Sequence, residues 1–219
     1  MQAIILAAGM GRRLGALTNN NTKCMLEVNG IKLIDRTLDI LDELNIRRVI
    51  LVVGYNAQNV VDHVGDKYKG MEITYVENSV YDKTNNIYSL FLARKHLLED
   101  DTLLLESDLI FEGDVVRKII EDSDPNIALV DKYESWMDGT VVTLDNDNKI
   151  AEFLGKDRFR YSDIDRYYKT VNIYKFSKEF STTHYVPFLE AYCHALGKNE
   201  YYEQVLRVIC MLDNSELKA

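Results

Sequence analysis

The sequence predicts an α/β protein with a mostly parallel mixed sheet, flanked by helices, and a small antiparallel flap. In residues 1–125, short apolar runs alternate with segments whose apolar residues recur at helical spacing. Such alternation is typical of a parallel sheet that helices cover on both faces. After Pro125 four strand-like runs follow one another without long helices, and from Ser177 the pattern is helical again. We therefore expect the later strands to extend the sheet and to form the flap.

The elements are expected in the following order. Buried strands are predicted at residues 2–7, 47–54, 71–78 and 101–109, with helices at 31–44, 57–68, 85–98 and 113–122. Asn85 or Asn86 would cap the third helix. Later strands are predicted at 126–133, 139–147, 149–155 and 167–176, and the last helices at 188–196 and 199–212. Since no repeat or linker interrupts this order, we expect a single domain over residues 1–219.

Composition narrows the class of protein. The chain of 219 residues has a formal charge of -9 and a pI near 5.0, which argues against a nucleic-acid-binding face. No apolar run approaches the roughly 18 residues of a membrane span, and we expect no signal peptide ahead of the first strand. Cys24, Cys193 and Cys210 are few, odd in number and widely spaced, which favours reduced thiols in the cytoplasm and no zinc site. We expect small-molecule partners, and neither nucleic acid nor membrane.

A glycine-rich, cationic loop follows the first strand. The strand end and the loop contain Leu6, Ala7, Ala8, Gly9, Gly11, Arg12 and Arg13. Small residues allow backbone N–H groups to converge on phosphate oxygens, and a guanidinium adds a bidentate clamp. The dinucleotide fingerprint needs a third glycine where Leu14 stands, and a Walker A loop is absent. A plain turn with solvated arginines is the alternative, but Lys23, about ten residues on, favours phosphate binding.

These segments carry a family resemblance. "LAAGMGRRL…TKCMLEVNGIKLI" resembles the N-terminal signature of nucleotidyltransferases with a glycosyltransferase-A-like, Rossmann-like fold, usually written LAAGxGxRL…PKxLLxVxGxPLI. Thr22 stands where the family has proline, which affects loop stiffness more than chemistry because Lys23 is kept. "YDKTNNIYSLFLAR" and "WMDGTVV" resemble the phosphocholine cytidylyltransferase branch. Sugar-phosphate enzymes of this fold tend to carry a glycine-rich stretch where Asn85 to Ser89 stand.

The fourth strand ends in acidic residues. Strand alternation sends Glu106 and Asp108 to one side, at the carboxyl edge where open α/β sheets bind ligands. Mg²⁺ prefers one or two carboxylates plus phosphate oxygens and water. The resemblance implies a metal role for Asp108, which we favour over helix capping; Glu106 is the weaker candidate. The family adds an aspartate from a C-terminal "EID"-like strand, and no such motif follows Leu212.

The resemblance therefore implies a division of labour. Residues 1–125 would form the nucleotide-binding half and residues 126–219 the acceptor-binding half, and we expect the chain to be C-terminally truncated. A fused second enzyme, aminotransferase-like in some relatives, is a possible partner. CTP would bind the glycine loop, Asn85, Ser89 and Glu106, with Mg²⁺ on Asp108. Catalysis would rest on Arg13, Lys23 and Asp108, without a general base.

The acceptor's headgroup would meet aromatic and acidic residues. The candidates are Tyr133, Trp136, Asp138, Glu200, Tyr202 and Glu203. Aromatic faces with carboxylates suit an ammonium group, but aromatics at helical spacing are usually core residues; both interpretations stay open. We expect a cytidylyltransferase that acts on phosphocholine or a similar amino-alkyl phosphate or phosphonate. The alternatives are a sugar-1-phosphate nucleotidylyltransferase that uses UTP or dTTP, and a nucleotide-sensing domain without turnover.

Overall fold

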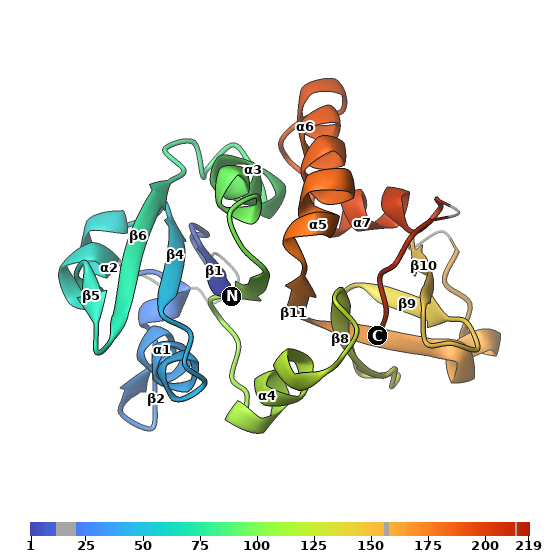
Figure 1. Cartoon of the computed structure of the whole chain (residues 1–219), viewed down its shortest axis with the longest axis horizontal. Helices are drawn as coiled ribbons and strands as arrows, with labels where there is room; N and C mark the ends of the chain where they lie inside the picture. The colour runs from blue at the N-terminus through green and yellow to red at the C-terminus, as the bar shows by residue number, and fades with distance from the viewer. Residues whose placement is uncertain (12–20, 156–157, 213) are drawn as a thin grey trace.

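The computed structural model of the chain describes residues 1–11, 21–155, 158–212 and 214–219. Within these residues one mixed sheet of nine strands has the order β10-β9-β11-β7-β1-β4-β6-β5, with β8 paired to β11. A separate small antiparallel hairpin joins β2 (Glu27–Val28) to β3 (Ile31–Lys32). This arrangement confirms the predicted mixed α/β class (Figure 1).

The centre of the sheet is parallel. β1 (Gln2–Ala7) lies between β4 (Arg48–Val53) and β7 (Thr102–Glu106), and β4 pairs with β6 (Met71–Glu77). Leu6 lies opposite Glu106 in the register of β1 and β7. Because the carboxyl ends of parallel strands meet at one edge of a sheet, the loop after β1 and the acidic end of β7 lie side by side.

The later strands extend the sheet, as expected. They are β8 (Ile127–Lys132), β9 (Val141–Leu144), β10 (Ile150–Leu154) and β11 (Tyr167–Phe176). β11 is antiparallel to β7, β8 and β9. Its pairing with β8 shifts between Thr170 and Tyr174, and within this bulge Asn172 has a φ of 59°. A bulge of this kind bends a strand and changes the direction of its side chains.

Helices cover both faces of the sheet (Figure 1). α1 (Leu33–Glu43), α2 (Ala57–Val64) and α4 (Gly113–Glu121) share one core cluster with Ala3 and Ile5 of β1. On the opposite face, α3 (Asn86–Leu97), α6 (Val186–Ala195) and α7 (Glu203–Ile209) share a second cluster with Ile4 and Leu6. Strand alternation explains this division, because successive side chains of β1 point to opposite faces.

Some boundaries differ from the expected ones. The helix predicted over 57–68 ends at Val64, because Gly65 has a φ of 73°, and the following residues form the edge strand β5 (Lys67–Tyr68). Helical structure resumes in α5 (Lys178–Phe180) and a π-helical turn, Ser181–Tyr185, as expected from Ser177 on. Asn85 is the cap of α3, since its side chain accepts a hydrogen bond from the Asn86 amide. Among the described helices, none has the length and apolar character needed to cross a membrane.

Candidate active site

A cleft of about 880 Å³ opens at the carboxyl ends of β1 and β7. The loop after β1, the start of α3, the bulged part of β11 and α7 contribute to its walls. It brings together many of the predicted site residues: Leu6, Ala8, Gly9, Gly11, Lys23, Asn85, Ser89, Glu106, Asp108, Asp138, Glu200 and Glu203. The cleft therefore lies where open α/β sheets bind their ligands.

Close packing explains why a small residue stands at Ala8, in the loop after β1. A Cβ atom on Gly54 would come within 2.9 Å of the Ala8 Cβ, and the amide of Tyr55 donates to the Ala8 carbonyl. Gly11 has a φ of 64°, a conformation that favours glycine. Ala7 is buried in the core and does not line the cleft. Arg12 and Arg13 lie outside the described residues, so their phosphate-binding roles stay predictions.

Lys23 and Asp108 form an ion pair in the wall of the cleft. Lys23 stands in a 3-10 turn, Lys23–Met25, and its Nζ lies 2.7 Å from Asp108 Oδ2. Both side chains are about a third exposed, at 32% and 36%. The structure thus joins two residues that the sequence predicted independently, one as a phosphate ligand and one as a metal ligand.

Glu106 lies deeper and contacts Asn86. The Asn86 side chain donates to Glu106 Oε1 at 2.9 Å and accepts the Tyr202 amide at 3.0 Å, so it connects β7 with the segment before α7. Burial, together with the charges of Glu203 and Asp108, raises the pKa of Glu106 to about 8. A carboxyl group that holds its proton near neutral pH is a poor ligand for a hard cation. The raised pKa of Glu106 therefore favours Asp108 over Glu106 as the metal ligand.

The residues present fit a metal site whose ligands come partly from the nucleotide better than one built from protein side chains alone. Within the described residues, no group of three or more acidic, histidine or cysteine side chains is arranged to hold an ion. Mg²⁺ in nucleotide sites commonly takes one or two carboxylates and completes its shell with phosphate oxygens and water. Asp108, partly exposed at the cleft edge, can supply one carboxylate of that kind.

Glu203 is a buried acid in the wall of the cleft. It is the first residue of α7 and only 6% exposed. Thr140 Oγ1 donates to its Oε1 at 3.4 Å, while its Oε2 is buried without a hydrogen-bond partner among the described residues. Burial raises the pKa of Glu203. Such a group is costly unless a ligand satisfies it, so Glu203 is poised to receive a donor.

The predicted aromatic residues do not line the cleft. Tyr202 is fully buried and packs edge-on against Tyr174, with ring centroids 5.8 Å apart. Tyr133 packs against Phe159 and donates to the Met137 carbonyl. Trp136 is 75% exposed, and its indole nitrogen donates to Glu134. Core packing therefore accounts for Tyr202, and packing against Phe159 accounts for the half-buried Tyr133. The described structure gives the predicted headgroup role of Trp136 no contact with the cleft.

The structure adds residues that the sequence did not single out as ligand contacts. These include Asn78, Tyr81, Thr84, Asn86, Thr140, Lys169, Asn172, Gln204 and Arg207. Asn78 is 1% exposed and donates to Thr84 and Ser89, so it holds the segment that carries Asn85 and Ser89, two predicted CTP ligands. The signal for Lys169 and Asn172 was an asparagine in the strand pattern "KTVNIYKF", because asparagine is depleted in strands and marks the bulge.

The fold and this cleft together define a nucleotidyltransferase domain. The chain belongs to the MobA-like NTP transferase domain family, whose model matches residues 3–163. It is 32% identical over 205 residues to a CMP-5'-(3-aminopropyl)phosphonate synthase of Streptomyces rubellomurinus, and this match covers 93% of the chain. The chain spans about a third of that relative, because the match covers 32% of its length.

Other relatives differ in what their names say they act on. A CTP:phosphoglutamine cytidylyltransferase of Campylobacter jejuni is 32% identical, with 82% of this chain and 74% of the relative covered. A UTP--glucose-1-phosphate uridylyltransferase of Haloferax volcanii is 35% identical over 61% of this chain and 55% of the relative. A solved CTP:phosphocholine cytidylyltransferase from Streptococcus pneumoniae has a TM-score of 0.76 at 23% identity, covering 99% and 88% of the two chains. This last likeness shows the fold.

Proposed function

We propose that this domain transfers CMP from CTP to a small phosphate or phosphonate that carries an ammonium group, with release of pyrophosphate. The observation that carries the proposal is the distribution of charged side chains in the cleft. Lys23 and Asp108 stand at one end, and the buried, partly unpartnered carboxylate of Glu203 stands in the acceptor half. The former suit a triphosphate with its metal, and the latter suits an ammonium group.

The reaction needs positioning and charge neutralisation more than acid–base chemistry. An oxygen of the acceptor phosphate or phosphonate attacks the α-phosphorus of CTP. The bond from that phosphorus to the bridging β-oxygen breaks, and pyrophosphate leaves. The second pKa of a phosphate monoester lies near ~6, so the acceptor is largely dianionic at neutral pH and needs no general base.

The chain's own residues divide the remaining work. Lys23 neutralises charge that gathers at the α-phosphate, where it acts most strongly in the transition state. Mg²⁺, when bound at Asp108, supplies further neutralisation of the phosphate oxygens. The loop after β1 offers backbone N–H groups to the outer phosphates. Glu203 holds the ammonium group and thereby orients the acceptor for in-line attack.

The choice of cytosine rests on the relatives. Two of the three curated relatives named above carry CMP or CTP in their names. The segment from Tyr81 to Ser89, held by Asn78, is the proposed base-contacting surface. The uridylyltransferase relative keeps a sugar-1-phosphate transferase as the second candidate.

Free thiols at Cys24, Cys193 and Cys210 favour a cytoplasmic location.

A substrate matrix tests the proposal. The four nucleoside triphosphates are each combined with phosphocholine, phosphoethanolamine, 2-aminoethylphosphonate and glucose-1-phosphate, and pyrophosphate release is measured. We expect turnover with CTP and the ammonium-bearing acceptors, and none in the Asp108→Asn variant. Turnover confined to UTP or dTTP with glucose-1-phosphate would make the domain a sugar nucleotidylyltransferase. CTP binding by calorimetry without turnover on any acceptor would indicate a nucleotide-sensing domain.

A further inference from the structure

Lys169 is a cation in the cleft wall that the proposed reaction does not use. It stands on β11 just ahead of the bulge and lines the cleft with Asp138 and Glu203. Its Nζ donates to the Thr170 carbonyl, and none of the carboxylates among the described residues forms an ion pair with it. A Cβ atom on Gly139 would come within 2.9 Å of this Nζ, so the glycine leaves room for the side chain. Burial lowers the pKa of Lys169, which signals a partly desolvated ammonium group.

The charged side chains follow one another along the cleft. Lys23 contacts Asp108, and Glu106 lies in the field of both Asp108 and Glu203. Glu203 in turn is influenced by Lys169, whose other charged neighbour is Asp138. Lys169 is therefore adjacent to the proposed ammonium site.

We propose that Lys169 binds a carboxylate of the acceptor, which makes the acceptor a phosphorylated or phosphono α-amino acid. This rests on the proposed function, because Glu203 must bind the ammonium group. An α-amino acid carries its ammonium and carboxylate on one carbon, so their partners must be neighbours, as Glu203 and Lys169 are. Arg207, one helical turn after Glu203, lines the same wall and adds a second cation. A simple amino alcohol phosphate would give Lys169 no carboxylate to bind, and its charge would be offset only by the nearby Glu203 and Asp138.

Matched acceptors test the carboxylate directly. O-phosphoserine and phosphoethanolamine differ only in that group, as do 2-amino-3-phosphonopropionate and 2-aminoethylphosphonate. With CTP and the wild-type chain, we expect kcat/KM to be roughly ten- to a hundredfold higher for the carboxylated member of at least one pair, the range for a hydrogen bond to a charged group. Equal or higher kcat/KM for the decarboxylated member in both pairs overturns the assignment, and this comparison needs no variant.

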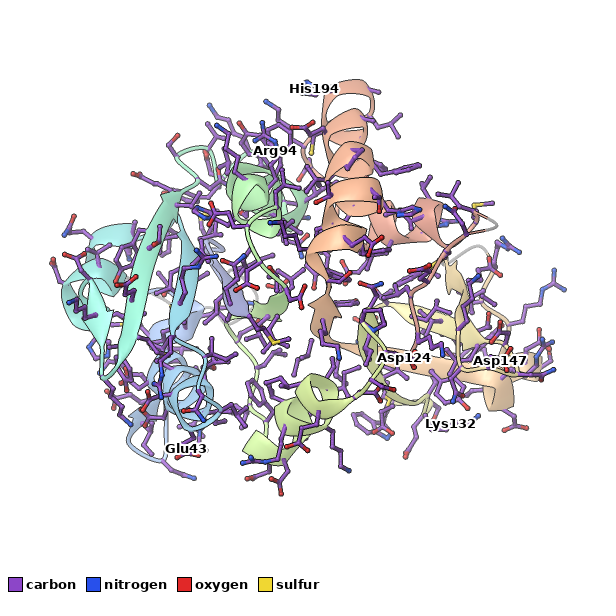
Figure 2. All side chains as sticks on the ribbon, in the orientation of Figure 1. Glu43, Arg94, Asp124, Lys132, Asp147 and His194 are labelled. Carbon is purple, nitrogen blue, oxygen red and sulfur yellow. The ribbon has the colours of Figure 1, made fainter. Side chains whose placement is uncertain are left out.

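A substitution then tests Lys169 itself. Lys169→Met keeps the length of the side chain and removes its charge. We expect KM for the carboxylated acceptor to rise about tenfold or more, while KM for CTP and for the decarboxylated acceptor change by less than about threefold. Lys169→Arg should recover part of the preference. Lys132→Met is the matched control, because Lys132 is an exposed lysine of the neighbouring strand β8 at the periphery of the molecule (Figure 2).

A structural role for Lys169 predicts a different pattern. In that case Lys169→Met would lower the melting temperature and change all three KM values together, and the assignment would be wrong.

Failure of the Lys169 assignment can be distinguished from failure of the proposed function. Turnover of phosphoethanolamine as efficient as that of O-phosphoserine, with the same result for the phosphonate pair, removes only the Lys169 assignment. Absence of CTP-dependent turnover on every acceptor removes the proposed function and the carboxylate site with it.

Discussion

The Nζ of Lys23 lies 2.7 Å from Asp108 Oδ2, so the cation expected at the α-phosphate contacts the carboxylate expected at the metal. An ion pair this exposed contributes about 0–1 kcal/mol to stability. A bound triphosphate and its metal offer each partner a stronger counter-charge. In the proposed function, the pair therefore holds both side chains near the positions assigned to them and offers little opposition to nucleotide binding.

Lys23→Ala should lower turnover much more than it weakens CTP binding, because the positive charge matters most where negative charge gathers in the transition state. We expect kcat to fall by roughly a hundredfold or more, the scale seen when one preorganised charge-stabilising group is removed. Steady-state kinetics, with CTP affinity measured separately by calorimetry, check this. Near-native kcat would reduce Lys23 to a surface residue of the loop.

Asp108→Asn should abolish Mg²⁺-dependent turnover while the fold stays intact. The substitution is isosteric, it removes the hard anionic ligand that Mg²⁺ prefers, and the Lys23 pair that it breaks contributes little to stability. Activity is measured across a range of Mg²⁺ concentrations, with a thermal melt of the same protein as control. Wild-type activity at ordinary Mg²⁺ would exclude Asp108 as the metal ligand.

Much of the fold follows from local pattern. Strands such as β1, which ends at Ala7, follow apolar runs in the sequence. Helices such as α3 begin at a recognisable cap, Asn85. The pattern could not show that Gly65 ends α2 early, since the apolar spacing runs on beyond it. Nor could it show the sheet order, because the pairing of β11 with β7, β8 and β9 depends on long-range contacts.

Residues of the cleft could be predicted where they stand beside a recognisable motif. Lys23 and Asp108 each stood beside a recognisable strand end or loop, and the structure places them in contact. Lys169 was not predicted, because its position in the cleft depends on a bulge and on a bare glycine at Gly139. Tyr202 shows the opposite difficulty: helical spacing leaves core and ligand contacts indistinguishable, and this residue belongs to the core.

The raised pKa of Glu203 predicts a pH dependence of stability. Burial raises this pKa above the ordinary value of 4.5, so the native state keeps a proton that the unfolded chain releases. The resulting stabilisation is complete below about pH 4.5 and is lost as the pH rises through the folded-state pKa. Glu203→Gln should therefore make the melting temperature less sensitive to pH between about 5 and 8. Thermal melts across that interval check this, and a variant as pH-sensitive as the wild type would refute it.

Tyr202→Phe should be neutral or slightly stabilising. The hydroxyl of Tyr202 is buried without a hydrogen-bond partner among the described residues, so its removal relieves a desolvation cost of about 1–3 kcal/mol at most. Tyr202→Ala should instead cost about 3–5 kcal/mol, as large-to-small core substitutions do. Chemical denaturation measures both. A raised acceptor KM in a stable Tyr202→Phe protein would return this residue to the acceptor site.

Trp136→Ala should leave stability within about 0.5 kcal/mol of the wild type, because the indole is 75% exposed and contacts Glu134 at the surface. In this position the ring does not line the cleft, so KM for the acceptor should also stay unchanged. Kinetics and melts on the same variant check both. A selective rise in acceptor KM, with KM for CTP unchanged, would show that the ring reaches the ammonium group during turnover.

The central claim is CTP-dependent transfer to an ammonium-bearing phosphate or phosphonate, and its most direct test is the rate of pyrophosphate release with equal concentrations of CTP and UTP. The acceptors are O-phosphoserine, 2-aminoethylphosphonate and glucose-1-phosphate, each with saturating Mg²⁺. The account predicts release with CTP and an ammonium-bearing acceptor at least about tenfold faster than with UTP, a difference of ~1.4 kcal/mol in transition-state binding. Equal or faster release with UTP, or release only with glucose-1-phosphate, would contradict it.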